Sequence, residues 1–255
     1  MPNPTLRRRA NFARIVFGVL LLACVLLLGG GYFATRPLPP MPEALAALEA
    51  DARVQVQTQP YLAFSPRNQM PQTGLIIYPG ARVDERAYAP TARAIAQHGF
   101  LVVIPDMPLH LALLSPERAT QVATLYPAVH RWALAGHSLG GVVAASFVKQ
   151  NRNSVVKGLA LWAAYPADAD DLSTFTHVAM ISIFGTQDKL YPPEKIDAAR
   201  ARLSPATQFV TIAGGNHAQF GYYGAQAGDG AATISREQQQ AQLVKVMVEF
   251  LQTLR

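Results

Sequence analysis

A serine flanked by glycines is the strongest chemical signal in this sequence. Residues 136–140 read Gly-His-Ser-Leu-Gly, and position 141 is also glycine. This Gly-x-Ser-x-Gly pattern is typical of a sharp turn that exposes a nucleophilic serine between a strand and a helix. Larger side chains at the glycine positions would collide with those flanking elements. The pattern predicts Ser138 as a nucleophile and the Leu139 N–H as a donor to a developing oxyanion.

A serine hydroxyl is a weak nucleophile and needs a base, which an acid holds in the right tautomer. Suitable partners follow in the order acid, then histidine: Asp188 within Phe-Gly-Thr-Gln-Asp, and His217 within Gly-Gly-Asn-His. We therefore expect Asp188 to orient His217, and His217 to take the Ser138 proton. Of the other histidines, His137 is expected to pack inside the turn, and His110 either lines the pocket or lies on the surface. The rival acids form one cluster: Asp168, Asp170 and Asp171.

The loop after residues 75–78 is expected to supply the second oxyanion donor. It reads Tyr-Pro-Gly-Ala-Arg, and we predict the Ala81 N–H as the donor, with Gly80 allowing close backbone approach. The residues expected to contact the substrate are Gly80, Met107, Tyr165 and Phe220. Further candidates for an apolar wall are Leu109, Leu111, Leu113 and Leu114. No metal-binding or cofactor motif occurs in the sequence, so we predict neither a metal nor an organic cofactor.

From residue 44 onward, apolar runs alternate with helical patterns, which favours a mostly parallel sheet with helices on both faces. Strands are predicted at residues 75–78, 100–104, 132–136, 156–163, 178–184 and 209–212, with a hairpin at 54–58 and 61–64. Helices are predicted at residues 86–98 and 139–150, and a last helix begins at a capping box spanning residues 235–238. Loops at the carboxyl ends of parallel strands meet at one edge, where the three catalytic side chains would gather.

Two loops bear on the shape of the site. Only 14 residues, 164–177, separate two predicted strands, which leaves no room for a large cap. We therefore expect an open, shallow site for small or solvent-exposed acyl groups. Residues 216–234 are rich in glycine and aromatic side chains, and they form either a wall of the cleft or a cover over the sheet edge.

With these motifs, the sequence resembles the α/β-hydrolase superfamily and, more narrowly, compact bacterial hydrolases related to dienelactone hydrolases. The resemblance covers roughly residues 55–255 and rests on residues 77–83, 103–108, 135–141, 184–188 and 214–221. It implies an α/β-hydrolase fold and its catalytic chemistry, while the substrate stays open. Dienelactone hydrolases proper have a cysteine where this chain has Ser138, which argues against lactone-specific chemistry.

The N-terminus has the composition of a membrane segment. Residues 15–35 carry no charged side chain, and as a helix they would span about 31 Å, close to the thickness of a bilayer core. Four arginines in residues 1–14 precede the segment, so the N-terminus is expected in the cytoplasm, near anionic lipids, and the rest outside. We predict an uncleaved signal anchor; the alternatives are a cleaved signal peptide and a lipoprotein signal at Cys24. The proline-rich residues 36–43 are expected to form a stiff stalk before one domain at 44–255.

Composition and charge exclude several other classes. The chain is 50% hydrophobic and 15% charged, which is not the composition of a disordered protein. Its single cysteine excludes a disulfide framework and a cysteine-based zinc site. Five of the six net positive charges lie in residues 1–36, so the main domain lacks the basic surface of a nucleic-acid-binding protein.

The sequence as a whole predicts a membrane-tethered serine hydrolase in the periplasm or outside the cell. It would cleave carboxylic esters or related acyl bonds of small-molecule substrates through an acyl-enzyme intermediate. Three alternatives stay open: an amide or peptide hydrolase, a thioesterase, and a non-catalytic binding protein that keeps the fold.

Overall fold

The computed structural model describes residues 36–152 and 154–254. The chain divides into two compact units, Met1–Arg36 and Pro37–Arg255, and the second unit is the one described below. The predicted membrane segment at residues 15–35 lies outside the described residues. Within the described ranges, no helix combines the length and the apolar character that crossing a membrane requires.

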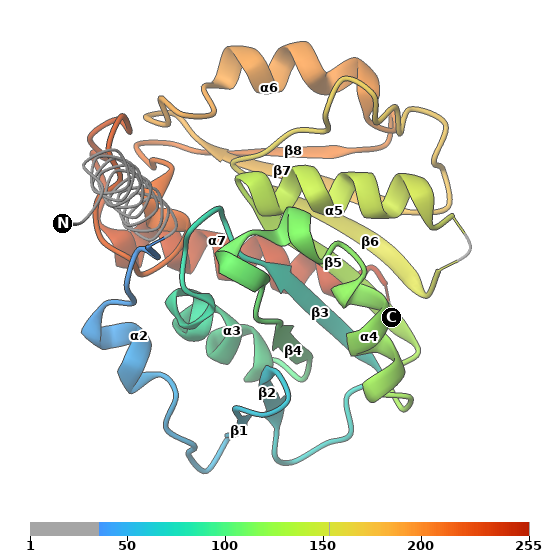
Figure 1. Ribbon diagram of the computed structural model, residues 1–255, viewed down its shortest axis with the longest axis vertical. Coiled ribbons are helices and arrows are strands. Elements are labelled where there is room, and N and C mark those ends of the chain that lie inside the picture. The colour runs from blue at the N-terminus through green and yellow to red at the C-terminus, as the bar shows by residue number, and fades with distance from the viewer. Residues whose placement is uncertain (1–35, 153, 255) are drawn as a thin grey trace, which may run out of the picture. The chain divides into compact units, whose positions relative to one another are not determined.

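An eight-stranded sheet runs through the second unit (Figure 1). Its strands are β1 (Val54–Gln57), β2 (Leu62–Pro66), β3 (Thr73–Tyr78), β4 (Leu101–Ile104), β5 (Arg131–His137), β6 (Val156–Trp162), β7 (Ala179–Gly185) and β8 (Gln208–Ile212). Their order across the sheet is β1-β2-β4-β3-β5-β6-β7-β8. β2 is antiparallel to β1 and β4, and every pairing from β4 to β8 is parallel. The mostly parallel sheet predicted from the sequence is confirmed.

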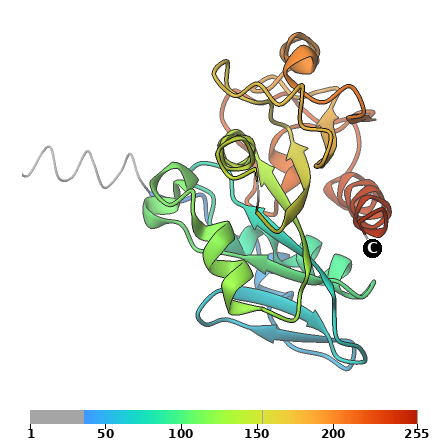
Figure 2. The same cartoon turned by 90° about the vertical axis from the view of Figure 1, so that its right-hand side faces the viewer.

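Helices cover both faces of this sheet (Figure 2). They are α2 (Pro42–Ala46), α3 (Ala89–Ala96), α4 (Arg118–Leu125), α5 (Leu139–Gln150), α6 (Pro193–Ala199) and α7 (Arg236–Gln252). One buried cluster joins α3 and α7 to the sheet, and the other joins α4 and α5 to it. Along β3, Leu75 and Ile77 belong to the first cluster, whereas Ile76 and Tyr78 belong to the second. This alternation follows from the two-residue period of a strand.

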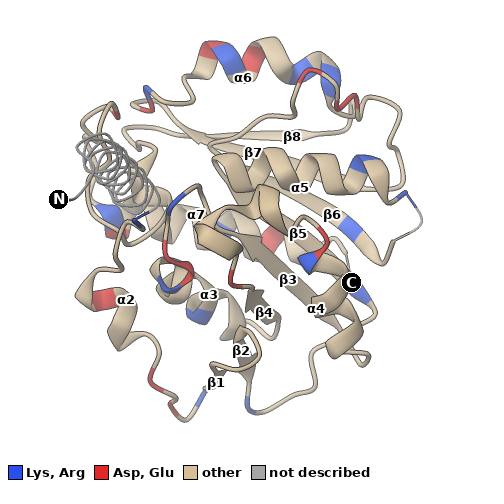
Figure 3. Cartoon of the chain, viewed as in Figure 1, with Lys and Arg blue, Asp and Glu red and all other residues tan. Residues whose placement is uncertain are grey.

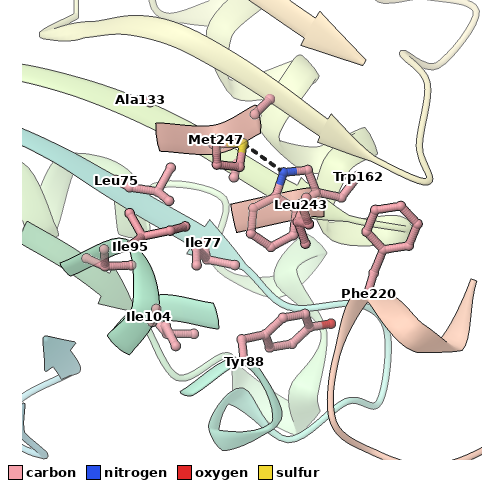
Figure 4. Close-up of a cluster of buried hydrophobic side chains, with 14 of the residues drawn as sticks. Leu75, Ile77, Tyr88, Ile95, Ile104, Ala133, Trp162, Phe220, Leu243 and Met247 are labelled. Carbon is pink, nitrogen blue, oxygen red and sulfur yellow. Dashed lines mark hydrogen bonds between the residues drawn. The ribbon is translucent and has the colours of Figure 1, made fainter. Parts of the chain in front are cut away.

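The cluster beneath α7 shows how the sheet is held in place (Figure 4). The Trp162 indole is fully buried, and its N–H points to the Met247 sulfur at 3.3 Å. Ile77 and Leu243 are also fully buried in this cluster. Each such side chain contributes about 1.5–3 kcal/mol of burial free energy, so the ends of the strands that position the site have a rigid base.

Most predicted elements are present with small shifts at their ends. The helix expected at residues 86–98 is instead a 3-10 turn, Glu85–Tyr88, followed by α3. The Asp84 carboxylate accepts the Arg86 N–H at 3.0 Å and starts this turn. The capping box predicted at residues 235–238 is confirmed, because the Ser235 and Gln238 side chains each bond the other's backbone N–H.

The proline-rich residues 36–43 differ from the stalk expected there. Leu38 forms a parallel bridge with Val83, and the Met41 N–H donates to the Tyr222 carbonyl at 2.7 Å. α2 then begins at Pro42. The prolines themselves lack an N–H, but the residues between them keep theirs, and these N–H groups attach the segment to the domain.

Candidate active site

Ser138 lies in a strained turn between β5 and α5. Its backbone has φ 54° and ψ −126°, a conformation that costs a non-glycine residue about 1–3 kcal/mol. A Cβ at Gly136 would collide with the Gly140 carbonyl, and a Cβ at Gly140 would collide with the carbonyl that ends β3. The Ser138 N–H donates to the Trp162 carbonyl at 3.0 Å, which fixes the turn to β6. The turn therefore has the geometry expected of a nucleophile at the edge of the sheet.

Asp188 and His217 form a buried pair at the same edge. The His217 Nδ1 and the Asp188 Oδ2 are 2.8 Å apart, and both side chains are fully buried. The other carboxylate oxygen, Oδ1, accepts the N–H groups of Leu190 at 2.9 Å and Tyr191 at 2.7 Å. With both oxygens engaged, Asp188 holds the imidazole in one orientation and leaves Nε2 free to act. Among the described residues, His217 Nε2 has no hydrogen-bond partner.

The loop that carries His217 is fixed from two directions. The Asp229 carboxylate accepts the N–H groups of His217 at 3.3 Å and Ala218 at 2.8 Å. From α7, the fully buried Gln239 side chain bonds both the N–H and the carbonyl of Asn216, at 3.0 and 2.9 Å. These contacts position the histidine before any substrate binds.

A second histidine lies beneath the site. The His137 ring is fully buried, and its centroid is 4.6 Å from that of His217. The Tyr88 hydroxyl accepts the Gly80 N–H at 2.9 Å and is 2.8 Å from His137 Nδ1, so it donates to that nitrogen. Burial, followed by the positive charge that His217 can carry, holds the pKa of His137 well below its usual range. His137 is therefore a neutral packing residue, as expected, and it also ties Gly80 to the nucleophile turn.

The oxyanion donors predicted at Ala81 and Leu139 lie on two adjoining segments. The loop at the end of β3 packs directly on Gly140, one turn from the nucleophile. Within this loop the N–H groups of Gly80, Arg82 and Val83 have partners: the Tyr88 hydroxyl, the His110 carbonyl and the Gly80 carbonyl. Among the described residues, the Ala81 N–H has none. Leu139 is the first residue of α5, where backbone N–H groups have no partner within the helix.

Tyr191 is a site residue that the sequence analysis missed. Its ring stacks on that of His217, with centroids 5.4 Å apart and planes inclined by 23°, and it also contacts the Tyr165 ring at 5.0 Å. Burial raises the pKa of Tyr191, and a hydrogen-bonding interaction with the Ser138 side chain opposes that rise. Tyr191 thus lies beside both Ser138 and His217. The sequence offered one indication: Tyr191 follows Asp188 by three residues, and an aspartate side chain often accepts hydrogen bonds from the N–H groups of the residues after it.

The residues expected to contact the substrate fare differently. Tyr165 is half-buried beside Tyr191 at the site. Met107 and Phe220 are 5% and 0% exposed and pack in the core, so a substrate contact stays a prediction for both. Gly80 is also buried, and its N–H and carbonyl are both bonded within the protein, so its role is to support the loop.

The loop at residues 216–234 serves as a cover rather than as a cleft wall. Phe220, Tyr222 and Tyr223 are all at most 8% exposed, and the Phe220 ring stacks on His137 with centroids 5.7 Å apart. The aromatic side chains that suggested a wall are therefore packed inside the domain, and that of Phe220 lies against His137. Of the two interpretations of this loop, the structure favours the cover over the sheet edge.

The charges of the second unit lie mainly on peripheral segments (Figure 3). α6 carries both signs, whereas α5 carries a single charged residue, Lys149, close to its C-terminal end. By contrast, Asp188 is buried in contact with His217, where solvent screens their interaction only weakly. The rival acid Asp168 has a side chain that is 98% exposed and pairs with Arg202 at 3.1 Å.

Comparisons with known proteins agree with this architecture. A model of the alpha/beta hydrolase family matches residues 74–241. Among solved structures, a predicted CIB-like hydrolase from Thermoplasma acidophilum has a TM-score of 0.56 at 14% identity, covering 79% of this chain and 99% of that chain. A putative dienelactone hydrolase from Klebsiella pneumoniae has a TM-score of 0.57 at 16% identity, covering 80% and 98%. Est1E from Butyrivibrio proteoclasticus has a TM-score of 0.54 at 14% identity, covering 79% and 100%. The search of curated proteins found no match.

Proposed function

Because the chain belongs to the alpha/beta hydrolase family, we propose that it is a serine hydrolase that cleaves carboxylic esters through Ser138, His217 and Asp188. The observation that carries the proposal is the buried 2.8 Å contact between Asp188 and His217, which leaves Nε2 as the only free ring nitrogen. A histidine in that tautomer accepts a proton from a serine hydroxyl. Ser138 follows His137 in the chain, and the His137 ring lies 4.6 Å from that of His217, which supports the proposal.

In the acylation step, His217 Nε2 takes the Ser138 proton while Oγ attacks the carbonyl carbon of the ester. The carbonyl oxygen becomes an oxyanion, which the N–H groups of Ala81 and Leu139 stabilise. His217 then returns the proton to the departing alkoxide, and an acyl-enzyme with an alcohol product results. In the second half, His217 removes a proton from water, the hydroxide attacks the acyl carbon, and the proton passes back to Ser138 as the carboxylic acid leaves.

A fluorophosphonate probe tests this proposal directly, because it reacts only with an activated serine. The full chain in detergent micelles is expected to label, and Ser138→Ala is expected to abolish the label and to lower kcat/KM by several orders of magnitude. A parallel panel of ester, thioester and amide substrates separates an esterase from the other acyl hydrolases. Absence of labelling in the folded wild-type chain would remove the serine mechanism and leave a binding protein of the same fold.

We further propose that the chain is tethered to a membrane with the hydrolase domain outside the cytoplasm. The support is the uncharged run at residues 15–35 and the four arginines that precede it. After cell lysis, the full chain should remain in the membrane fraction through a carbonate wash, and a chain starting at Pro37 should not. Recovery of the full chain in the soluble fraction would contradict the tether.

A further inference from the structure

A groove of about 490 Å³ lies along α5, and its lining includes Leu139, the residue after Ser138. Its apolar lining comes from Leu139, Val142, Val143 and Phe147 on α5 and from Leu113 on the facing segment. A larger cavity of about 670 Å³ lies between α3 and α7, and none of the triad residues lines it. None of the triad residues lines the groove along α5 either, but Leu139, the residue that follows Ser138 in the chain, does line it.

The lining residues of α5 form one continuous face. They fall at positions 139, 142, 143, 146, 147 and 150, the spacing that places side chains on the same side of a helix. At 1.5 Å per residue, this face extends about 16 Å from the first residue of α5 toward its C-terminal end. Leu139, Val142 and Ser146 are half-buried, so the floor of the groove is open to a ligand.

Leu139 connects this groove to the reaction centre. Its N–H is the proposed oxyanion donor, while its side chain lines the groove. An acyl group on Ser138 has its carbonyl oxygen at that N–H, so its chain starts within one residue of the apolar floor.

Exposed leucines occur on the segment that includes Leu113, which lines the groove. Leu109, Leu113 and Leu114 are 58%, 65% and 51% exposed. They belong to two short 3-10 turns, Pro108–His110 and Ala112–Leu114, and the second turn packs against α5. Exposed leucines gathered beside a groove are a sign of apolar ligand binding.

From these observations we infer that the groove binds an unbranched aliphatic acyl chain, so that the physiological substrates are esters of medium-length or longer fatty acids. The inference rests on the proposed function and names the substrate class of the same site. A surface groove of this kind holds the chain along α5 without a cap, in agreement with the short segment at residues 164–177.

The experiment compares p-nitrophenyl acetate, butyrate, hexanoate and octanoate with the full chain in detergent micelles. Each methylene that enters the groove should raise kcat/KM by about fourfold, which corresponds to about 0.8 kcal/mol per buried methylene. Val142→Trp fills the groove one turn from Leu139 and should lower the octanoate-to-acetate ratio of kcat/KM by at least about tenfold. Lys195→Trp, on the exposed side of α6, is the matched control and should leave that ratio unchanged.

A second variant tests the opposite direction. Ser146→Leu extends the apolar floor and should raise the octanoate-to-acetate ratio, whether or not Val142→Trp folds. A ratio that stays flat from acetate to octanoate, or that neither variant moves, would overturn the inference. If the acetate ester is still hydrolysed and Ser138 still labels in that case, the proposed function stands and only the groove assignment fails. If no ester is hydrolysed and no label appears, both fail together.

Discussion

Replacing Asp188 by asparagine should almost abolish hydrolysis while leaving the fold intact, and the reason lies in two backbone N–H groups. The Asp188 Oδ1 accepts the N–H groups of Leu190 and Tyr191 at 2.9 and 2.7 Å. In Asp188→Asn, the carbonyl oxygen must take that place, because turning the NH2 group toward those donors would leave buried hydrogen bonds unmade at about 1–3 kcal/mol each. The NH2 group then faces His217 Nδ1, 2.8 Å away in the wild type.

An amide NH2 donates, so Nδ1 would become the acceptor and the ring proton would move to Nε2. His217 in that tautomer cannot take the proton of Ser138. The same replacement of a triad acid lowers kcat by about 10⁴-fold in a serine protease of this mechanism, equivalent to about 5 kcal/mol of transition-state stabilisation. We expect a loss of similar size in kcat/KM for p-nitrophenyl acetate.

The assay needs a control for the change of charge. Asp168→Asn removes the rival acid, whose side chain is 98% exposed and makes only a surface ion pair, and it should keep wild-type activity. Thermal unfolding monitored by circular dichroism confirms that both variants fold. A loss below about tenfold in folded Asp188→Asn, or an equal loss in Asp168→Asn, would refute the argument that Asp188 sets the tautomer.

Three further predictions follow from the same region. Tyr191→Phe keeps the ring stack on His217 but removes the hydroxyl that faces Ser138, so kcat should fall about three- to tenfold with little change in KM; an unchanged kcat would contradict that role. Gly140→Ala places a methyl group against the backbone carbonyl that ends β3 and should lower the free energy of unfolding in urea by about 1–3 kcal/mol; equal stability would show that the turn can relax. Because burial lowers the pKa of His137 below its usual 6.5, the unfolded state binds the extra proton, and the unfolding midpoint should fall as the pH drops below about 6.5. His137→Gln should reduce that slope, and an unaltered slope would assign it to other groups.

The nucleophile turn was predictable because its signal is local. Gly136 and Gly140 are required by contacts within a few residues and with the adjoining strand end, so the pattern can be read without the fold. Asp188 and His217 needed one more step, the rule that loops at the carboxyl ends of parallel strands gather at one edge. The strands before these loops were predicted from runs of apolar residues that are long enough to identify a buried strand.

The substrate contacts were not predictable to the same degree. Phe220 follows β8 and Met107 follows β4, but an apolar side chain near a site packs equally well inward, and these two are 0% and 5% exposed. Tyr191 was missed because its side chain points toward the site, whereas the pattern does not show this. Its position depends on the turn that Asp188 caps and on the ring of His217. Whether a loop side chain points toward the core or toward the site depends on the tertiary structure, and residue spacing along the chain does not reveal it.

The short helices escaped prediction for a different reason. α2, α4 and α6 have five to eight residues, and so few positions show no clear helical period. They are stabilised by packing against the domain instead, as the buried Val122 of α4 and Ile196 of α6 illustrate.

The hydrogen bonds of Leu38 and Met41 attach the start of the domain to two loops of the candidate site. The Leu38 N–H donates to the carbonyl of Arg82, the residue after Ala81. The Met41 N–H donates to the carbonyl of Tyr222, five residues beyond His217. Proteolytic removal of residues 37–43 would thus act first on the two loops that carry the proposed oxyanion donor, Ala81, and the proposed base, His217. A chain that begins at residue 44 would lose both hydrogen bonds, whereas one that begins at Pro37 retains them.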